Sequence, residues 1–360
     1  MWKSLFKRSK AAYQVKIRPL DTEIEVPKDT PILEVALQHG IAFPHSCRVG
    51  TCGTCKCRLI EGKVYEITDK AHALTAEELR ENYILACQSL ARSDLIIEVP
   101  NLSLTKIVHK IRQVGGTITA LNPLTHDILE LVVKTDFPVM YTAGQYCEIY
   151  VEGVVTDDAR QQRSYSFAVA TGEKPTDIVR FHIRKVPNGM FTTWLFEQGK
   201  IGQRLQGHGP YGDFWLRPAP NPILCIAGGS GMAPIKAVLE QAIADGVGRD
   251  VYYLFGVRAQ RDLYGLAEME AVGKAWRGRF EFVPVLSEEP EGSNWQGRRG
   301  FVTQHIAPIV GDRLRDCHVY MCGPPPMIDA AQTVIDQAGI DRQHIHFDKF
   351  YDRSHLTAAG

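Results

Sequence analysis

Hydrophobic positions along the chain follow three kinds of spacing, and each predicts a different architecture. Near the start, apolar residues alternate with polar ones over 13–18 and 23–26, which predicts a hairpin of half-buried strands. An apolar run with helical spacing follows between Pro31 and Gly40, residues suited to beginning and ending a helix. Later elements are a strand near 57–60, a helix over 75–82 with the capping signature Thr75-x-x-Glu78, and a strand over 94–99. Together they predict a small α+β unit.

The middle of the chain is rich in β-branched runs separated by turn residues, a pattern typical of an antiparallel barrel. The predicted strands are 107–114, 128–134, 146–151, 164–170 and 178–185, with a helix-like segment at 191–196. A proline-rich linker at 218–222 ends this region.

The last third alternates strand and helix, which predicts a doubly wound parallel sheet. Its predicted strands are 223–227, 250–257, 280–286 and 318–321, and its helices are 233–244 and 327–337. The predicted domains are thus an α+β unit at 13–102, a barrel at 103–220 and an α/β domain at 221–350, between a leader (1–12) and a tail (351–360).

Composition narrows the functional classes. The 360 residues are 44% hydrophobic and 23% charged, with 41 basic and 41 acidic side chains, so nothing predicts nucleic-acid binding. No apolar run approaches the roughly 20 residues of a membrane span. The basic leader lacks an apolar signal region; we favour a solvated N-terminus over a short interfacial helix and expect no membrane contact. Free thiols predict a reducing compartment, the cytoplasm.

The cysteines carry the strongest chemical signal. Cys47, Cys52 and Cys55 are spaced C-x4-C-x2-C, and Cys87 lies far downstream, which is the plant-type [2Fe–2S] pattern. Gly50 and Gly53 allow the sharp bends that bring three thiolates to two irons. Zinc remains an alternative but usually shows two matched C-x2-C pairs. A disulfide framework suits small secreted chains, and here the cysteine count is an odd nine. Buried apolar cysteines are common but do not cluster this way.

Resemblances to known families add to these patterns. The segment from Pro44 to Cys55 resembles the cluster loop of plant-type ferredoxins, which implies a β-grasp fold, with Cys57 as a packed thiol rather than a ligand. Arg163-Ser164-Tyr165-Ser166 resembles the R-x-Y-S strand of the ferredoxin–NADP reductase superfamily. By that resemblance Arg163 binds the FAD pyrophosphate, Tyr165 lies against the isoalloxazine, and Ser166 hydrogen-bonds the reacting N5 region.

Further motifs support the flavin and nicotinamide sites. The resemblance assigns cofactor binding on the barrel to His182, Ile183, Arg184, Gly189, Met190, Phe191 and Thr192. Gly207–Phe214 matches the turn that ends the flavin domain. The turn Gly228-Gly229-Ser230-Gly231 lets backbone approach a pyrophosphate at a helix start. The resemblance also assigns nicotinamide-nucleotide binding to Arg258, Cys322, Gly323 and Pro324, with Cys322 beside the nicotinamide, and places Phe350 over the flavin.

The module order resembles the reductase components of bacterial multicomponent oxygenases. The resemblance implies that NADH delivers a hydride to FAD, and that electrons then pass singly through the cluster to an oxygenase, directly or through a separate ferredoxin. Two alternatives remain: an arm of an NADH–quinone oxidoreductase, and a redox sensor that binds cofactors without turnover. NADH is favoured over NADPH because Glu288 stands where NADPH-using relatives carry an arginine after a serine, here Ser287. The carboxylates of Glu288 and Glu289 should repel a 2′-phosphate, whereas Arg258 or Arg261 could reach it from the neighbouring strand end.

Overall fold

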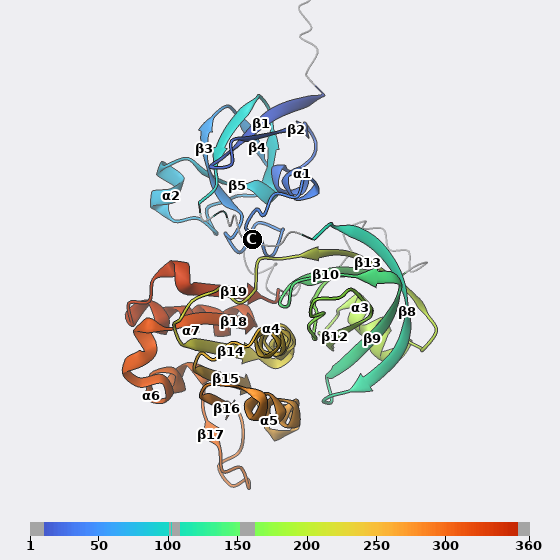
Figure 1. The fold of residues 1–360 in the computed structure, drawn as a ribbon, viewed down its shortest axis with the longest axis vertical. Coiled ribbons are helices and arrows are strands. Elements are labelled where there is room, and N and C mark those ends of the chain that lie inside the picture. The colour runs from blue at the N-terminus through green and yellow to red at the C-terminus, as the bar shows by residue number, and fades with distance from the viewer. Residues whose placement is uncertain (1–10, 101, 103–108, 152–162, 352–360) are drawn as a thin grey trace, which may run out of the picture. The chain divides into compact units, whose positions relative to one another are not determined.

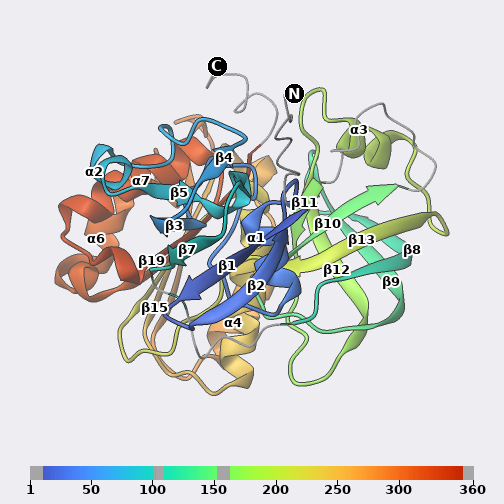
Figure 2. The same cartoon turned by 90° about the horizontal axis from the view of Figure 1, so that it is seen from above.

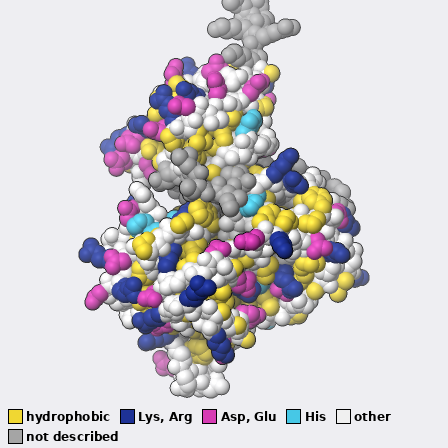
Figure 3. All heavy atoms as spheres, in the orientation of Figure 1, with side chains coloured by type: hydrophobic (Ala, Val, Ile, Leu, Met, Phe, Trp, Pro, Cys, Tyr) yellow, Lys and Arg dark blue, Asp and Glu magenta, His cyan; other side chains and the backbone are white. Residues whose placement is uncertain are grey.

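The computed structural model describes residues 11–100, 102, 109–151 and 163–351. It divides into two compact units, residues 1–111 and 112–360 (Figure 1). On the face shown in Figure 3, acidic and basic side chains are interspersed on each unit, in keeping with the zero net charge.

The first unit is built on a five-stranded mixed sheet in the order β2-β1-β7-β3-β5. Its strands are β1 (Ala12–Arg18), β2 (Thr22–Pro27), β3 (Lys56–Glu61), β5 (Tyr83–Leu85) and β7 (Leu95–Glu98), and β4 (Val64–Glu66) pairs with β6 (Ser89–Ala91) separately. Helix α1 (Ile32–Gln38) buries five apolar side chains, and Gly40 ends it with a positive φ of 72°. Helix α2 (Ala76–Arg80) has the predicted capping box between Thr75 and Glu78. The predicted hairpin, helices and strands of this unit are confirmed.

The second unit begins with a six-stranded antiparallel sheet in the order β11-β10-β13-β8-β9-β12. Its strands are β8 (Arg112–Pro123), β9 (Ile128–Val139), β10 (Tyr146–Val151), β11 (Arg163–Ser166), β12 (Thr176–Arg184) and β13 (Arg204–Tyr211). A bridge between Phe167 and Phe181 links the two edge strands and closes a barrel, whose curvature is visible in Figure 2. Helix α3 (Met190–Glu197) packs Phe191 and Leu195 into the barrel core.

One barrel strand departs from the sequence expectation. Strand β13 occupies residues whose glycines and proline indicate a turn rather than a strand. The strand forms because Gly207 and Gly209 permit close contact: a Cβ at either position would lie 2.9 Å from the Cys147 sulfur or 3.1 Å from the Tyr146 carbonyl oxygen. The predicted strand 107–114 lies partly outside the described residues, and β8 begins at Arg112.

The rest of the second unit is a six-stranded parallel sheet in the order β17-β16-β15-β14-β18-β19. Its strands are β14 (Ile223–Gly228), β15 (Val251–Val257), β16 (Phe280–Leu286), β17 (Arg298–Arg299), β18 (His318–Gly323) and β19 (Ile345–Lys349). Helices α4 (Met232–Ala244) and α5 (Leu266–Ala275) cover one face, and α6 (Ile306–Val310) and α7 (Pro325–Gln337) cover the other (Figure 1). Strand β14 is buried throughout, and the chain turns to opposite faces on either side of it, which is where α/β sheets bind ligands.

Candidate functional site

The predicted cluster loop brings its four cysteines into two pairs. The sulfur atoms of Cys55 and Cys87 lie 3.2 Å apart, and Cys47 is hydrogen-bonded to Cys52. Cys55 and Cys87 are buried, whereas Cys47 and Cys52 are partly exposed. The loop and the distant fourth cysteine therefore form one site, in which Cys47 and Cys52 are less buried as residues than Cys55 and Cys87.

Glycines shape this loop as the sequence predicts. Gly50 and Gly53 have φ values of 87° and 70°, and a Cβ on Gly53 would lie 2.8 Å from the Ala73 carbonyl oxygen. The Gln88 side chain donates a hydrogen bond to the Arg48 carbonyl oxygen (3.1 Å), which ties the loop to the segment that carries Cys87. No side chain other than a glycine's hydrogen fits at Gly53 without a shift.

The thiols of this site do not ionise independently. The hydrogen bond from Cys52 lowers the pKa of Cys47 to about 5, and the same contact together with burial raises the pKa of Cys52 well above its usual value. The contact with Cys87 and burial likewise raise the pKa of Cys55. A bound metal removes this conflict because it deprotonates the thiols that coordinate it. The donor set therefore fits a [2Fe–2S] cluster.

Cys57 lies next to this site but belongs to the core of the first unit. It is fully buried on β3, opposite Ile84 of β5, and burial raises its pKa. An uncharged, packed thiol matches the role expected of it; that it is not a ligand stays a prediction.

Strand β11 carries the three residues predicted to contact the flavin. Arg163 and Tyr165 are half-buried, and Ser166 is buried. The Tyr165 ring lies 5.4 Å from that of Phe191 on α3, and burial raises the pKa of its hydroxyl. The strand therefore sits beside the start of α3, where the other predicted flavin contacts lie.

The start of α3 offers free backbone donors. Gly189 stands at the N-cap position without a side-chain cap, and a Cβ there would lie 2.5 Å from the Thr192 hydroxyl oxygen. That hydroxyl donates to the Gly189 carbonyl and accepts from the Val186 N–H, so it shapes the loop itself. Met190 is exposed at the first helical position. An uncapped helix start of this kind fits a pyrophosphate.

Two of the predicted cofactor-binding residues of β12, Ile183 and His182, have different surroundings. Ile183 is fully buried in the barrel core, so only its backbone can contact a cofactor. His182 Nδ1 lies 3.3 Å from the Tyr264 hydroxyl, which donates to the Gly229 carbonyl oxygen at 3.0 Å. Because a hydroxyl has one proton to donate, His182 Nδ1 donates to Tyr264. The barrel therefore supports the glycine turn of the parallel sheet through two side chains.

That glycine turn forms a cradle in which side chains would not fit. A Cβ on Gly231 would lie 2.2 Å from the Cys322 carbonyl oxygen, and one on Gly228 would lie 2.7 Å from the Met327 sulfur. Gly229 has a φ of 53° and faces open space. The turn precedes α4, which likewise has no side-chain cap. Its backbone N–H groups fit the pyrophosphate of a dinucleotide.

A cavity of about 250 Å³ extends from this turn across the carboxyl ends of β15 and β16. Its lining includes the predicted Gly228, Gly229, Arg258 and Pro324, and also Ser287. Phe301 lines it as well and is 68% exposed. Its ring is a surface on which a nucleotide base can stack. We call this cavity the nicotinamide cleft.

Four charged side chains meet in the cleft. Two of them, Asp127 and Asp262, were not predicted from the sequence. Arg258 Nη2 lies 3.1 Å from Asp127 Oδ2 and 3.1 Å from Asp262 Oδ1, and Arg184 Nε lies 3.2 Å from Asp127 Oδ2. Asp127 belongs to the turn between β8 and β9, and Asp262 ends a short 3-10 helix, Gln260–Asp262. Asp262 could have been found from the sequence, because it lies only four residues after Arg258. Nothing in the sequence near Asp127 indicates its contact with Arg258.

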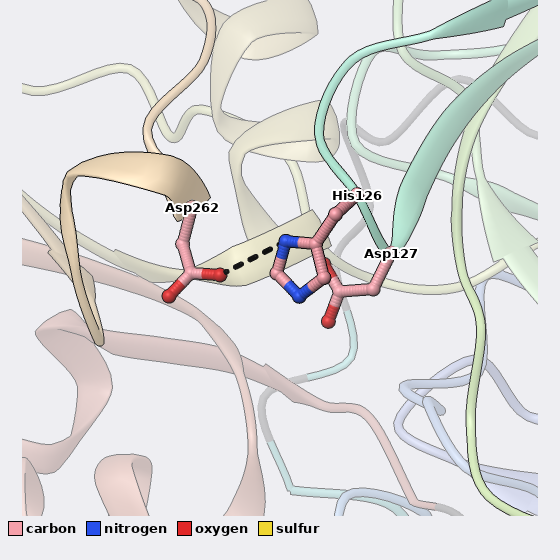
Figure 4. Close-up of side chains that lie close together, drawn as sticks. All are labelled: His126, Asp127 and Asp262. Carbon is pink, nitrogen blue, oxygen red and sulfur yellow. Dashed lines mark ion pairs between the residues drawn. The ribbon is translucent and has the colours of Figure 1, made fainter.

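His126, Asp127 and Asp262 also come close together (Figure 4). His126 Nδ1 lies 3.5 Å from Asp262 Oδ1. This trio resembles a metal-ligand set, but Arg258 donates to both carboxylates. The guanidinium therefore supplies the positive charge that the two carboxylates require.

Cys322 and Phe350 are the remaining predicted site residues, and neither lines the nicotinamide cleft. Cys322 is fully buried at the end of β18, and burial raises its pKa well above the usual value. The Phe350 N–H donates to the Gly323 carbonyl oxygen (2.9 Å), and its ring packs partly buried against the core shared by the barrel and the parallel sheet. Their contacts with nicotinamide and flavin stay predictions.

Comparison with known proteins agrees with these sites. Three family models match: the 2Fe-2S iron-sulfur cluster binding domain over 15–92, the oxidoreductase FAD-binding domain over 116–215, and the oxidoreductase NAD-binding domain over 225–333. The chain is 40% identical to the xylene/toluene monooxygenase electron transfer component XylA of Pseudomonas putida, over 94% of both proteins. It is 32% identical to the phenol 2-monooxygenase reductase component DmpP of Pseudomonas sp. CF600, over 94% of this chain and 95% of that protein.

A solved structure is also similar. The Amycolatopsis cytochrome P450 reductase GcoB is 30% identical and superposes with a TM-score of 0.80, covering 94% of this chain and 98% of that one. The fold and sites thus define an iron–sulfur flavoprotein oxidoreductase that takes electrons from a nicotinamide dinucleotide. The chain belongs to the family of reductase components of multicomponent oxygenases.

When bound, the nicotinamide nucleotide, FAD and the cluster would supply the redox chemistry, namely hydride transfer and single-electron transfer. The protein supplies position. The uncapped starts of α3 and α4 are the places that would orient pyrophosphates, and the cleft, lined by barrel and sheet residues, is where the nucleotide would bind. Cys47, Cys52, Cys55 and Cys87 are the residues that would hold the cluster.

Proposed function

We propose that this reductase delivers electrons to the oxygenase component of a monooxygenase that acts on apolar hydrocarbons, without a separate ferredoxin. The observation that carries this proposal is the 40% identity, over 94% of both chains, to an electron transfer component named for xylene and toluene oxidation. Relatives named for propane and phenol monooxygenases support the same class of partner. The [2Fe–2S] module already within the chain supplies a one-electron donor.

The site residues take the following roles in this proposal. Arg163 and the α3 start hold the FAD pyrophosphate, Tyr165 and Ser166 contact its ring system, and Phe350 covers it. The Gly228–Gly231 turn holds the nucleotide pyrophosphate, and Cys322 lies beside the nicotinamide. A guanidinium and uncapped N–H groups supply charge and directed donors to phosphate oxygens.

NADH rather than NADPH is the proposed coenzyme. Glu288 is exposed beside Ser287 at the end of β16, where a carboxylate repels a 2′-phosphate. Glu289 contributes less than its sequence position suggests, because it accepts hydrogen bonds from the backbone and the side chain of Gln260 (2.8 and 2.6 Å). The guanidinium of Arg299 is likewise engaged, because it donates hydrogen bonds to the carbonyl oxygens of Trp295 and Pro290 and to the Ser293 hydroxyl.

A reducing compartment, the cytoplasm, completes the proposal, since none of the nine cysteines forms a disulfide. Among the described residues, none of the helices has the length and hydrophobicity that crossing a bilayer requires.

The test is reconstitution. The holoprotein, NADH and a purified hydrocarbon monooxygenase hydroxylase are mixed with toluene, and product is measured with and without an added ferredoxin. We expect product without the ferredoxin, and none when the reductase carries Cys87→Ser. Turnover only with added ferredoxin would instead favour a system like that of the naphthalene dioxygenase reductase component, which is 33% identical. If the protein reduced neither the hydroxylase nor the ferredoxin, the result would favour a redox sensor without turnover.

A further inference from the structure

Arg258 stands where a general rule of dinucleotide recognition predicts NADP. In doubly wound sheets, the residue at the end of the second strand contacts the adenosine ribose: an acidic residue accepts from the 2′-hydroxyl of NAD, and an arginine accommodates the 2′-phosphate of NADP. Strand β15 is the second strand here, and Arg258 follows its last residue, Val257. It lines the cleft beside Ser287, and its side chain is 40% exposed.

The structure shows that this guanidinium is already engaged. Its Nη2 donates to Asp127 Oδ2 and to Asp262 Oδ1, both at 3.1 Å. The two acceptors come from different parts of the unit, a barrel turn and the 3-10 helix after β15. Both carboxylates are well covered, with side chains 17% and 7% exposed. Covered carboxylates interact more strongly with their partner than solvent-exposed ones do.

The charges of the cleft cancel. Among the residues that line it, the cations are Arg184 and Arg258, and the anions are Asp127 and Asp262. Arg184 also contacts Asp127, so one carboxylate serves both guanidinium groups. A 2′-phosphate adds a charge of about −1.5 to −2, which must find a cation or displace a carboxylate from one. A bare 2′-hydroxyl makes no such demand.

We propose that Asp127 and Asp262 determine coenzyme selectivity by holding Arg258 in ion pairs, so that this arginine is not available to a 2′-phosphate. The proposal rests on the NADH preference proposed above and assigns it to two residues other than Glu288. Asp262 acts locally, because its Oδ2 also accepts from the Ala259 N–H (3.0 Å) and is thereby fixed in place. Asp127 acts from the barrel, which makes selectivity a property of both parts of the unit.

The variants follow from the contacts. Asp262→Asn keeps an oxygen for the Ala259 N–H but presents an amide N–H₂ group, which cannot accept from Arg258. Asp127→Asn does the same for the barrel side, and the double variant releases Arg258 fully. Asp136→Asn is the matched control: it also removes a carboxylate paired with an arginine, Arg204, but on the barrel strand β9, and Asp136 does not line the cleft.

The measurement is isothermal titration calorimetry of NAD⁺ and NADP⁺ binding to the flavin- and cluster-loaded protein. It is made at pH 8 and low ionic strength, so that screening of the charges is weak. We expect the ratio of the NADP⁺ to the NAD⁺ dissociation constant to fall at least tenfold in the double variant and by less in Asp262→Asn. It should not change in Asp136→Asn. Adding Arg258→Ala to the double variant should restore the ratio.

Three results would overturn the proposal: an unchanged ratio in the folded double variant, an equal gain for both nucleotides, or a gain that survives Arg258→Ala. If Asp262→Asn does not fold, as judged by circular dichroism, Asp127→Asn alone decides, with the same expected direction. A wild-type ratio near one would instead refute the NADH preference itself. The two failures are therefore distinguishable.

Discussion

The cluster loop and the nicotinamide cleft both contain buried ionisable groups, but those groups are compensated in opposite ways. In the loop, four thiols converge, and their mutual contacts and burial push the pKa values of Cys47 and Cys52 in opposite directions. In the cleft, two arginines and two aspartates satisfy one another before any ligand binds. The loop is complete only with a metal, whereas the cleft is electrically complete when empty.

This difference has a physical consequence for each region. Thiolates held together by a metal contribute the metal's binding free energy to the local fold, so loss of one ligand affects the whole loop. A cleft of paired side chains keeps its shape when empty, and a ligand must then compete with the existing pairs. Changes in the loop are therefore expected to be all-or-none, and changes in the cleft graded.

The largest effect is expected from Cys87→Ser. Removing one of four ligands should lower the iron content from two per chain and abolish cytochrome c reduction, because a bulky one-electron acceptor needs the cluster. NADH–ferricyanide activity should survive, since ferricyanide can take electrons from the flavin. Iron analysis, electron paramagnetic resonance of the reduced protein and both assays are the measurements. Cys57→Ser is the matched control and should keep both irons; equal loss of both activities in Cys87→Ser would contradict the electron route.

Arg163→Ala tests the flavin site and should give a graded loss. Removing a charge-assisted contact to the pyrophosphate costs about 1.5–3 kcal/mol, so FAD should bind about 10- to 150-fold more weakly. Fluorescence titration of the flavin-depleted protein measures the dissociation constant. An unchanged constant would remove Arg163 from the site. Release of FMN rather than FAD from the wild-type protein would be a deeper contradiction.

Acid pH should destabilise the second unit before the first. Burial lowers the pKa of His182 and of His346 to about 3, and that of His318 to about 4, and all three belong to the second unit. Because these folded-state values lie below the usual 6.5, the stability they contribute is present above pH 6.5 and is lost as pH falls toward 4 and 3. In the first unit the pKa of Glu78 lies below its usual 4.5, so its contribution is lost only at lower pH.

Denaturant unfolding of the loaded protein between pH 8 and 4 measures this. Flavin fluorescence reports the second unit, and the visible absorbance of the cluster reports the first. We expect the flavin transition to weaken first on acidification, and less so in His346→Gln. Simultaneous weakening of both transitions from pH 6.5 would contradict the assignment.

The smallest effect is expected from Glu288→Arg. An exposed charge changes binding by about 0.2–1 kcal/mol, so the ratio of kcat/KM for NADPH to that for NADH should rise only a few-fold. Steady-state kinetics with both coenzymes is the check. A larger shift than that of the Asp127 and Asp262 double variant would return the main role to the end of β16.

What the sequence determined by itself is local. The cysteine spacing, the glycines at positive φ, the capping box of α2 and the glycine turn before α4 each arise within a dozen residues, because backbone bends and helix starts depend on neighbouring residues. Cys87 is the exception, found only because a four-ligand pattern demands a fourth cysteine.

Only the tertiary structure decided the remainder. Asp127 and Arg258 are 131 residues apart and meet because the barrel turn and the end of β15 line one cleft. Strand β13 forms where its glycines indicate a turn, because neighbouring strands leave room for nothing larger. Glu289 is engaged by Gln260, so its carboxylate is not the free charge that its position suggests. Whether a charged side chain is available to a ligand or already paired depends on which residues the fold places beside it. The spacing of residues along the chain does not predict those neighbours.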